Sequence, residues 1–185
     1  MPRIDHKSTA TLTHERPVIV YSNDFLCDLS PRAAWRLESL GFDNVCDYVA
    51  GKEDWLAYGL PIEGELAEAV TVGKLADREV PVCRFDDKLA DLVQRLRPTG
   101  WSECVVVNEP GIVLGLLRKS MWEHPADDRT AEQVMESGPI TFRPSVRRDE
   151  MVSYLQEKQM QSALVTTSDG KLVGLLRRKD LEEDR

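Results

Sequence analysis

Cysteine and histidine are scarce in this 185-residue sequence, and neither occurs at metal-binding spacing. The cysteines lie far apart and form no CxxC motif, whereas a zinc site usually needs paired close ligands. We therefore expect no metal site and no metal cofactor. A chain of this size with an ordinary core does not need a disulfide framework, so reduced thiols, as found in the cytoplasm, are expected.

Long apolar runs are also missing, because no stretch approaches the ~18 residues of a membrane helix. The N-terminus is polar and has no apolar run of the signal-peptide type, so we expect a cytoplasmic protein without a membrane partner. The formal net charge of −8 is a poor match to phosphate backbones, which argues against a nucleic-acid partner. The composition, 42% hydrophobic and 30% charged, is that of one globular domain or two small ones.

An internal repeat is the most informative feature that is present. A shift of 59 residues aligns 71–121 with 130–180 without a gap. Each copy runs through a short helix, a short strand, an amphipathic helix, two strands joined by a turn and a short charged helix. The first amphipathic helix has one apolar face, formed by Leu89, Leu92, Val93 and Leu96. A unit of about 50 residues is marginal alone, so we expect the two copies to share a core.

The segment GKLVGLLRRKDL at 170–181 is the most specific part of the repeat. It resembles the closing motif of CBS (cystathionine-β-synthase) domains, which is a Gly, two aliphatic residues, Ser or Thr, two variable residues and Asp. The glycine, both leucines and Asp180 match, whereas Arg177 stands where Ser or Thr is usual. The resemblance implies a CBS domain 1 at 71–124 and a CBS domain 2 at 130–182. The fold class expected is α/β (α+β), a tandem βαββα pair preceded by an N-terminal βαβα unit.

Paired CBS domains resemble one another in binding adenosine nucleotides between the two copies. The resemblance therefore implies AMP, ADP, ATP or S-adenosylmethionine as ligand. The residues that we expect at a nucleotide site in the second copy are Thr141, Phe142, Ala163, Leu164, Arg177, Arg178 and Asp180.

Each of these residue types suits one part of the ligand. The Asp180 carboxylate can accept hydrogen bonds from both ribose hydroxyls, and the two arginines can contact a phosphate. The other four residues would form walls for the adenine ring. In the first copy Met121 stands in the place of Asp180, so we expect one ligand per pair. The plainer alternative is that Asp180 only complements a helix dipole and that residues 177–179 form a solvated basic turn.

Residues 16–66 form a different unit, preceded by a polar tail at 1–15. The runs RPVIVYS and NVCDYVAG indicate two strands, each followed by a helix, and Ser30 is placed to cap the first helix. A βαβα order implies parallel strands joined by a right-handed crossover. The segment resembles the C-terminal half of a rhodanese domain, in which Gly-Phe precedes the second strand and Gly, Trp and Gly-Leu-Pro follow it, as at 41–42, 51, 55 and 59–61 here.

The rhodanese nucleophile is a cysteine directly after the first of these strands, and Ser22 stands there instead. A serine hydroxyl cannot carry a persulfide, so we expect no sulfur transfer by the usual route and no catalytic residue. Cys27, later in the same loop and close to Arg32, is the alternative nucleophile. A half domain also leaves sheet edges uncovered, so it should dock on the repeat, on a second chain or on its own tail.

Three hypotheses follow for the function. The first is a non-catalytic regulatory protein, in which the CBS pair senses an adenosine nucleotide and the N-terminal unit supports a homodimer and an unidentified regulated protein. The second is a thiol-dependent sulfurtransferase or reductase that uses Cys27. The third is a structural assembly protein that binds no small ligand.

Overall fold

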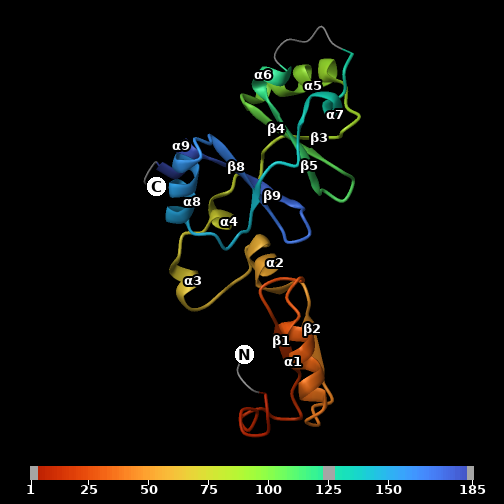
Figure 1. The fold of residues 1–185 in the computed structure, drawn as a ribbon, viewed down its shortest axis with the longest axis vertical. Helices are drawn as coiled ribbons and strands as arrows, with labels where there is room; N and C mark the ends of the chain where they lie inside the picture. Colours follow the sequence, from red (N-terminus) through yellow and green to blue (C-terminus); the bar gives the residue numbers. More distant parts are fainter. Residues whose placement is uncertain (1–3, 123–127, 183–185) are drawn as a thin grey trace. The chain divides into compact units, whose positions relative to one another are not determined.

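The computed structural model describes residues 4–122 and 128–182, and the chain divides into two compact units, Met1–Tyr58 and Gly59–Arg185 (Figure 1). The predicted N-terminal segment 16–66 thus extends beyond the compact N-terminal unit. Residues 1–3 of the predicted tail and 123–124 of the predicted first repeat lie outside the described residues. Among the described helices, none combines the length and the apolar character needed to span a bilayer.

The N-terminal unit is built on a two-stranded parallel sheet. Strand β1 (Val18–Tyr21) leads through helix α1 (Leu29–Glu38) to strand β2 (Val45–Tyr48), and helix α2 (Gly51–Ala57) follows. The register places Val18 opposite Val45 and Tyr21 opposite Tyr48. The structure confirms the predicted βαβα order and the parallel pairing of its strands.

Helix α1 begins differently from the prediction. Its N-cap residue is Asp28, which makes no side-chain cap hydrogen bond, and Ser30 lies inside the first turn. The Ser30 hydroxyl instead donates to the hydroxyl of Ser22 at 3.3 Å. Ser30 is buried under the loop after β1, so its hydroxyl links that loop to the helix rather than capping it.

The N-terminal tail packs on its own unit. The His14 ring stacks on Phe42 with ring centroids 4.1 Å apart, and its Nδ1 lies 2.7 Å from the carbonyl oxygen of Gly41. Arg36 of α1 donates from Nε to the Ile4 carbonyl at 3.0 Å. Own-tail docking, one of three predicted solutions, is thus present, while on β1 Ile19 and Tyr21 remain 64% and 62% exposed.

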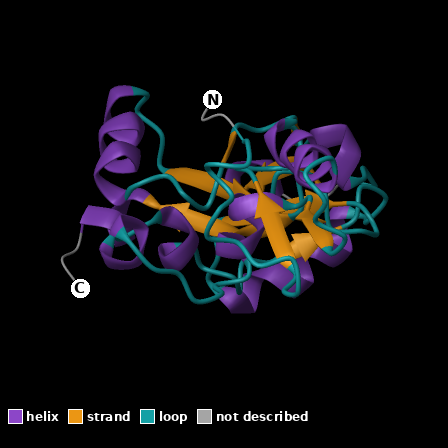
Figure 2. Ribbon diagram, turned by 90° about the horizontal axis from the view of Figure 1, so that it is seen from below, coloured by secondary structure: helices purple, strands orange, loops and turns teal. Residues whose placement is uncertain are grey.

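The C-terminal unit contains two sheets and the helices that connect their strands. Figure 2 distinguishes the helices, strands and loops of the chain by colour. Its order is α3 (Glu65–Glu68), α4 (Val72–Leu75), β3 (Val82–Cys83), α5 (Leu89–Leu96), η1 (Arg97–Thr99), β4 (Glu103–Val107), β5 (Val113–Arg118), α6 (Lys119–Trp122), α7 (Ala131–Val134), β6 (Glu136–Ser137), β7 (Thr141–Phe142), α8 (Arg148–Glu157), β8 (Ser162–Thr166), β9 (Leu172–Arg177) and α9 (Arg178–Glu182). One sheet has the strand order β3-β4-β5-β6, and the other has the order β7-β8-β9.

The two copies exchange their opening segments. Strand β6, which follows α7 in the opening segment of the second copy, pairs antiparallel with β5 of the first copy through Glu136 and Leu116. In the same way Asp77 of the first copy forms a bridge with Leu175 of β9. The sequence pattern, which runs through each copy in turn, does not reveal this exchange. It covers edges of β5 and β9 that would otherwise be left unpaired.

Two main-chain hydrogen bonds join the hairpins of the two copies, and their residues correspond under the 59-residue shift. The Val113 N–H donates to the Gly170 carbonyl at 3.0 Å, and the Leu172 N–H donates to the Gly111 carbonyl at 3.0 Å. A buried cluster beside this junction draws on both copies; it comprises Val80, Val105, Val107, Leu116, Leu164 and Leu175. The predicted common core of the two repeats is thus confirmed.

The amphipathic helices pack as the sequence indicated, with one substitution. In α5 the four apolar residues of the predicted face are each at most 3% exposed. In α8 Arg148 stands where α5 has Leu89, and its Nε and Nη2 donate to the carbonyl oxygen of Leu181 at 2.8 and 2.5 Å. The charged residue therefore holds the end of α9 against α8.

Candidate functional site

A cleft of about 290 Å³ lies in the C-terminal unit, on the second-copy sheet. The exchanged segment of the first copy forms one side of it, and β9, α9 and the start of α8 form the rest. Its lining residues are Val70, Leu75, Asp77, Arg148, Leu175, Leu176, Arg177, Asp180 and Leu181. The cleft therefore exists because the opening segments are exchanged.

Arg177 and Asp180, both predicted site residues, meet in this cleft. The Arg177 Nε donates to Asp180 Oδ2 at 2.7 Å, and Arg177 Nη2 lies 3.6 Å from Asp77 Oδ2. The side chains of the three residues are 30–39% exposed. One guanidinium thus lies between two carboxylates that come from different copies of the repeat.

A fourth side chain completes the surroundings of Arg177. Its Cζ lies 4.5 Å from the centroid of the Trp101 ring, a cation–π contact. Trp101 precedes β4, so it too belongs to the first copy. Three side chains, drawn from both copies of the repeat, thus surround the guanidinium of Arg177.

The remaining predicted site residues do not line the cleft. Thr141 and Phe142 are half-buried on β7, where the Phe142 ring meets Tyr154 edge-on at 5.1 Å. Ala163 and Leu164 on β8 are each 2% exposed, and Leu164 belongs to the shared core described above. The guanidinium of Arg178 faces Glu182 of α9. The structure thus brings together two of the seven predicted residues.

Sequence reasoning did not identify Asp77 or Trp101. The repeat contained a signal for the first, since the 59-residue shift pairs Asp77 with Glu136 and both are acidic. Trp101 aligns with Met160, so the repeat gives no corresponding signal for it. Both residues reach the second-copy cleft from the first copy, which a reading of one copy at a time does not reveal.

The equivalent place in the first copy is arranged differently. Arg118, which aligns with Arg177, donates from Nε and Nη2 to Glu136 Oε2 at 3.2 and 3.1 Å. Met121, which aligns with Asp180, accepts the Arg118 backbone N–H on its sulfur at 3.4 Å. The first copy thus retains the arginine and an acidic partner from the other copy, with Glu136 in the place of Asp77. A thioether stands where the second copy has the Asp180 carboxylate.

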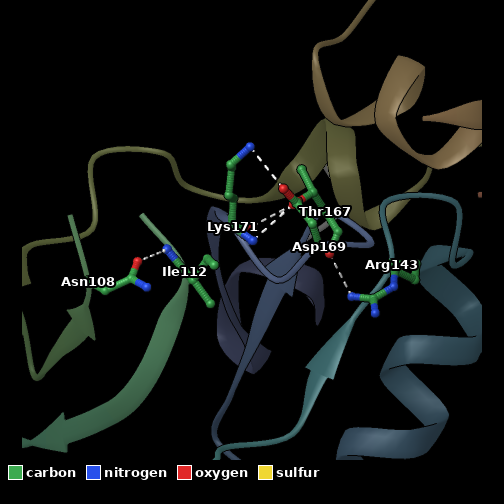
Figure 3. A network of polar contacts seen from close by, with 6 residues as sticks. All are labelled: Asn108, Ile112, Arg143, Thr167, Asp169 and Lys171. Carbon is green, nitrogen blue, oxygen red and sulfur yellow. Dashed lines mark hydrogen bonds and ion pairs between the residues drawn. The ribbon is translucent and has the colours of Figure 1, made fainter. Parts of the chain in front are cut away.

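Polar contacts hold the hairpin ends beside the junction (Figure 3). Arg143 Nη1 donates to Thr166 Oγ1 at 2.7 Å and to the Thr167 carbonyl at 2.9 Å. Asp169 accepts from Thr167 Oγ1 and pairs with Lys171 Nζ at 2.9 Å. The hydrogen bonds from Lys171 and Thr167 lower the pKa of Asp169 below its usual value. In the first copy Arg84 likewise donates to the carbonyl of Asn108, so these paired arginines hold turns in place.

Both the hydroxyl and the carbonyl of Ser22 form hydrogen bonds within the N-terminal unit. Its hydroxyl donates to the carbonyls of Asp24 and Cys27 at 3.1 and 3.3 Å. The Ser22 carbonyl accepts from the Lys52 N–H at 3.0 Å, which fixes the start of α2. Cys27 is half-buried, and the guanidinium of Arg32 lies 3.5 Å from Asp28. These hydrogen bonds hold the loop after β1 together and attach it to the start of α2.

The cysteines are free, and two of them lie together in the core. Cys83 on β3 and Cys104 on β4 are 3% and 0% exposed. The hydrogen bond with Cys83, together with burial, raises the pKa of the Cys104 thiol. Among residues 4–122 and 128–182, no three His, Cys, Asp or Glu side chains are grouped so that they could hold a metal ion.

Comparison with known proteins agrees with this architecture. The family model of the CBS domain matches residues 131–183. An uncharacterized protein of Methanopyrus kandleri is 23% identical over 121 residues, which are 61% of each chain, so this chain spans less than two thirds of that relative. The cytosolic domain of the Mg²⁺ channel MgtE in complex with ATP superposes with a TM-score of 0.56 at 22% identity, over 63% of this chain and 50% of that one.

A second solved structure matches over nearly its whole length. CBSX2 of Arabidopsis thaliana in complex with AMP gives a TM-score of 0.54 at 18% identity, over 60% of this chain and 92% of that one. The C-terminal unit therefore has the fold of a CBS domain pair, which is an α+β fold, as the sequence predicted.

Proposed function

We propose that the C-terminal unit is a regulatory module that binds one adenosine nucleotide in the cleft at Arg177 and Asp180. The observation that carries the proposal is a guanidinium and a carboxylate 2.7 Å apart in a cleft with apolar walls. Its volume is close to the lower end of the usual range for small-molecule sites, about 300 Å³. The complexes of proteins of this fold with ATP and AMP support the choice of ligand class.

Each part of the ligand has a partner of suitable chemistry in the cleft. Asp180 can accept hydrogen bonds from the ribose hydroxyls, and Arg177 can make charge-assisted contacts with a phosphate. Val70 and Leu75 offer apolar surface to the adenine ring, in place of the four wall residues that the sequence suggested. The Met121 thioether is a weak acceptor, so the first copy should not hold a ribose in this way.

We infer that the N-terminal unit is a non-catalytic, rhodanese-like interaction segment. Its βαβα order and the Ser22 substitution support this, because the Ser22 hydroxyl is engaged by loop carbonyls. The exposed Ile19 and Tyr21 offer an apolar surface to a second copy of the chain. In this proposal the nucleotide changes how the protein acts on a regulated partner, and no chemical step takes place.

Calorimetric titration of the full chain with AMP, ADP, ATP and S-adenosylmethionine tests the proposed site. Asp180→Ala removes the acceptor of the ribose hydroxyls. Hydrogen bonds to a charged group are worth about 1.5–3 kcal/mol each, so nucleotide affinity should fall at least about tenfold. Met121→Ala is the matched control and should change affinity little. Unchanged affinity in Asp180→Ala, or loss only in Met121→Ala, would place the site elsewhere.

A further inference from the structure

The side chain of Arg177 already holds one oxygen of the carboxylate that a ribose would need. Its Nε holds Asp180 Oδ2 at 2.7 Å, while its Nη2 faces Asp77 Oδ2 at 3.6 Å. A ribose that bonds both oxygens of Asp180 through its two hydroxyls must therefore displace Arg177 from Oδ2 or share that oxygen with it. A ligand without a second anionic group offers the freed guanidinium nothing in exchange.

We propose that Arg177 determines specificity by competing with the ribose for Asp180, so that the cleft selects nucleotides that carry a phosphate over uncharged nucleosides. The inference rests on the proposed nucleotide site. In the ligand-free protein the guanidinium lies between two carboxylates and balances the charge of one of them. When a nucleotide enters, the guanidinium exchanges a carboxylate for the phosphate, and Asp180 becomes available to the ribose. A nucleoside displaces the guanidinium from Asp180 but has no phosphate to offer it in return.

The surroundings of Arg177 allow this exchange. Its side chain is 30% exposed, so the guanidinium can turn without opening the core. Arginine is suited to the task because its planar fork matches both carboxylate and phosphate groups. The Trp101 ring, 4.5 Å from Cζ, supports the guanidinium in its starting position. Trp101 should therefore sense the departure of the charge.

The first copy provides a matched control. Arg118 occupies the equivalent position and is bound to Glu136, but a methionine stands where the second copy has Asp180. Arg118→Ala removes a comparable surface ion pair and leaves the proposed exchange intact. Any effect of Arg177→Ala that Arg118→Ala does not share thus belongs to the second-copy cleft.

The experiment measures the affinities of AMP and adenosine by calorimetry for the wild-type chain, Arg177→Ala and Arg118→Ala. The wild type should bind AMP at least about tenfold more tightly than adenosine. In Arg177→Ala adenosine should bind more tightly than in the wild type and AMP less tightly, so that the ratio approaches one. Arg118→Ala should keep the wild-type ratio. Arg177→Lys, which keeps the charge without the fork, should give an intermediate ratio.

Tryptophan fluorescence gives a second readout that affinity alone does not. AMP should change the emission of the wild type, and the change should be lost in Arg177→Ala and in Trp101→Phe. An unchanged AMP-to-adenosine ratio in Arg177→Ala, or a parallel loss of both ligands, would overturn the inference while leaving the nucleotide site standing. Absence of binding in the wild type and in every variant would overturn the proposed function itself.

Discussion

Asp77 and Leu175 exchange two main-chain hydrogen bonds, of 2.9 and 3.0 Å, although they belong to different copies of the repeat. This pairing brings the Asp77 carboxylate to the cleft and closes the free edge of β9. Gly174, next to Leu175, permits the close approach, because a Cβ built there would lie 2.6 Å from the Asp77 carbonyl oxygen. The geometry of the cleft therefore depends on the glycine at position 174, which has no Cβ to block this pairing.

Gly174→Ala is expected to destabilise the protein more than Gly115→Ala. At Gly174 the new methyl group meets fixed backbone of residue 77, and overpacking of this kind costs about 1–3 kcal/mol. At the equivalent Gly115 it meets chiefly the Met135 side chain, which can move aside. Urea denaturation of the two variants measures the difference in the free energy of unfolding. Equal losses would contradict the expected role of the Asp77 backbone.

The repeat architecture could be predicted because the pattern is local. Leu89, Leu92, Val93 and Leu96 follow helical spacing, and the sequence therefore identified the buried face of α5 correctly. The parallel strands of the N-terminal unit followed from chain order alone, because two neighbouring strands joined by a helical crossover run parallel. Such inferences use only neighbours along the chain.

The site was predicted only in part, because it is assembled across the repeat. Arg177 and Asp180 are three residues apart, so the motif revealed both. Asp77 and Trp101 reach the cleft through the exchange of opening segments, which depends on pairing between distant strand edges. Leu164 was placed at a ligand wall for the same reason, since its burial against the first copy has no signature within one repeat.

Sulfurtransferase activity is not expected from this chain. Ser22 replaces the sulfur acceptor, and its hydroxyl is already bound to the loop carbonyls at 3.1 and 3.3 Å. Thiosulfate-to-cyanide transfer should therefore stay at the uncatalysed level, and Ser22→Cys alone should restore little of it. Cys27→Ser is the control. Turnover in the unmodified protein that this change abolishes would favour the enzyme hypothesis.

The protein is expected to form a homodimer. β1 leaves Ile19 and Tyr21 more than 60% exposed, and unpaired strand edges favour association. Light scattering should give twice the chain mass at high micromolar concentration, and Ile19→Glu should shift the mass toward the monomer. Glu38→Gln, at an exposed position of α1, should leave the dimer unchanged. A clean monomer of the wild type at that concentration would refute the expectation.

Asp169 should make stability depend on pH at the acid end. Its bonds from Lys171 and Thr167 lower the pKa in the folded protein, so the folded state favours the charged form more than the unfolded chain does. This contribution is fully present above the ordinary aspartate pKa of about 3.9 and is lost as the pH falls through the lower folded value. Because the side chain is 45% exposed, solvent screening keeps the effect small.

Asp169→Asn should therefore melt below the wild type at pH 7, and the difference in Tm should shrink and then vanish as the pH is lowered through 4 to about 2. Added salt should reduce the difference at pH 7, because the Lys171 ion pair is surface-accessible. Asp149→Asn is the matched control, since that carboxylate is 76% exposed beside Arg147, and it should lower Tm less. Thermal melts across the pH series decide the matter. A gap that persists unchanged at pH 2 would mean that the amide side chain disturbs the turn sterically and that the ion pair contributes nothing.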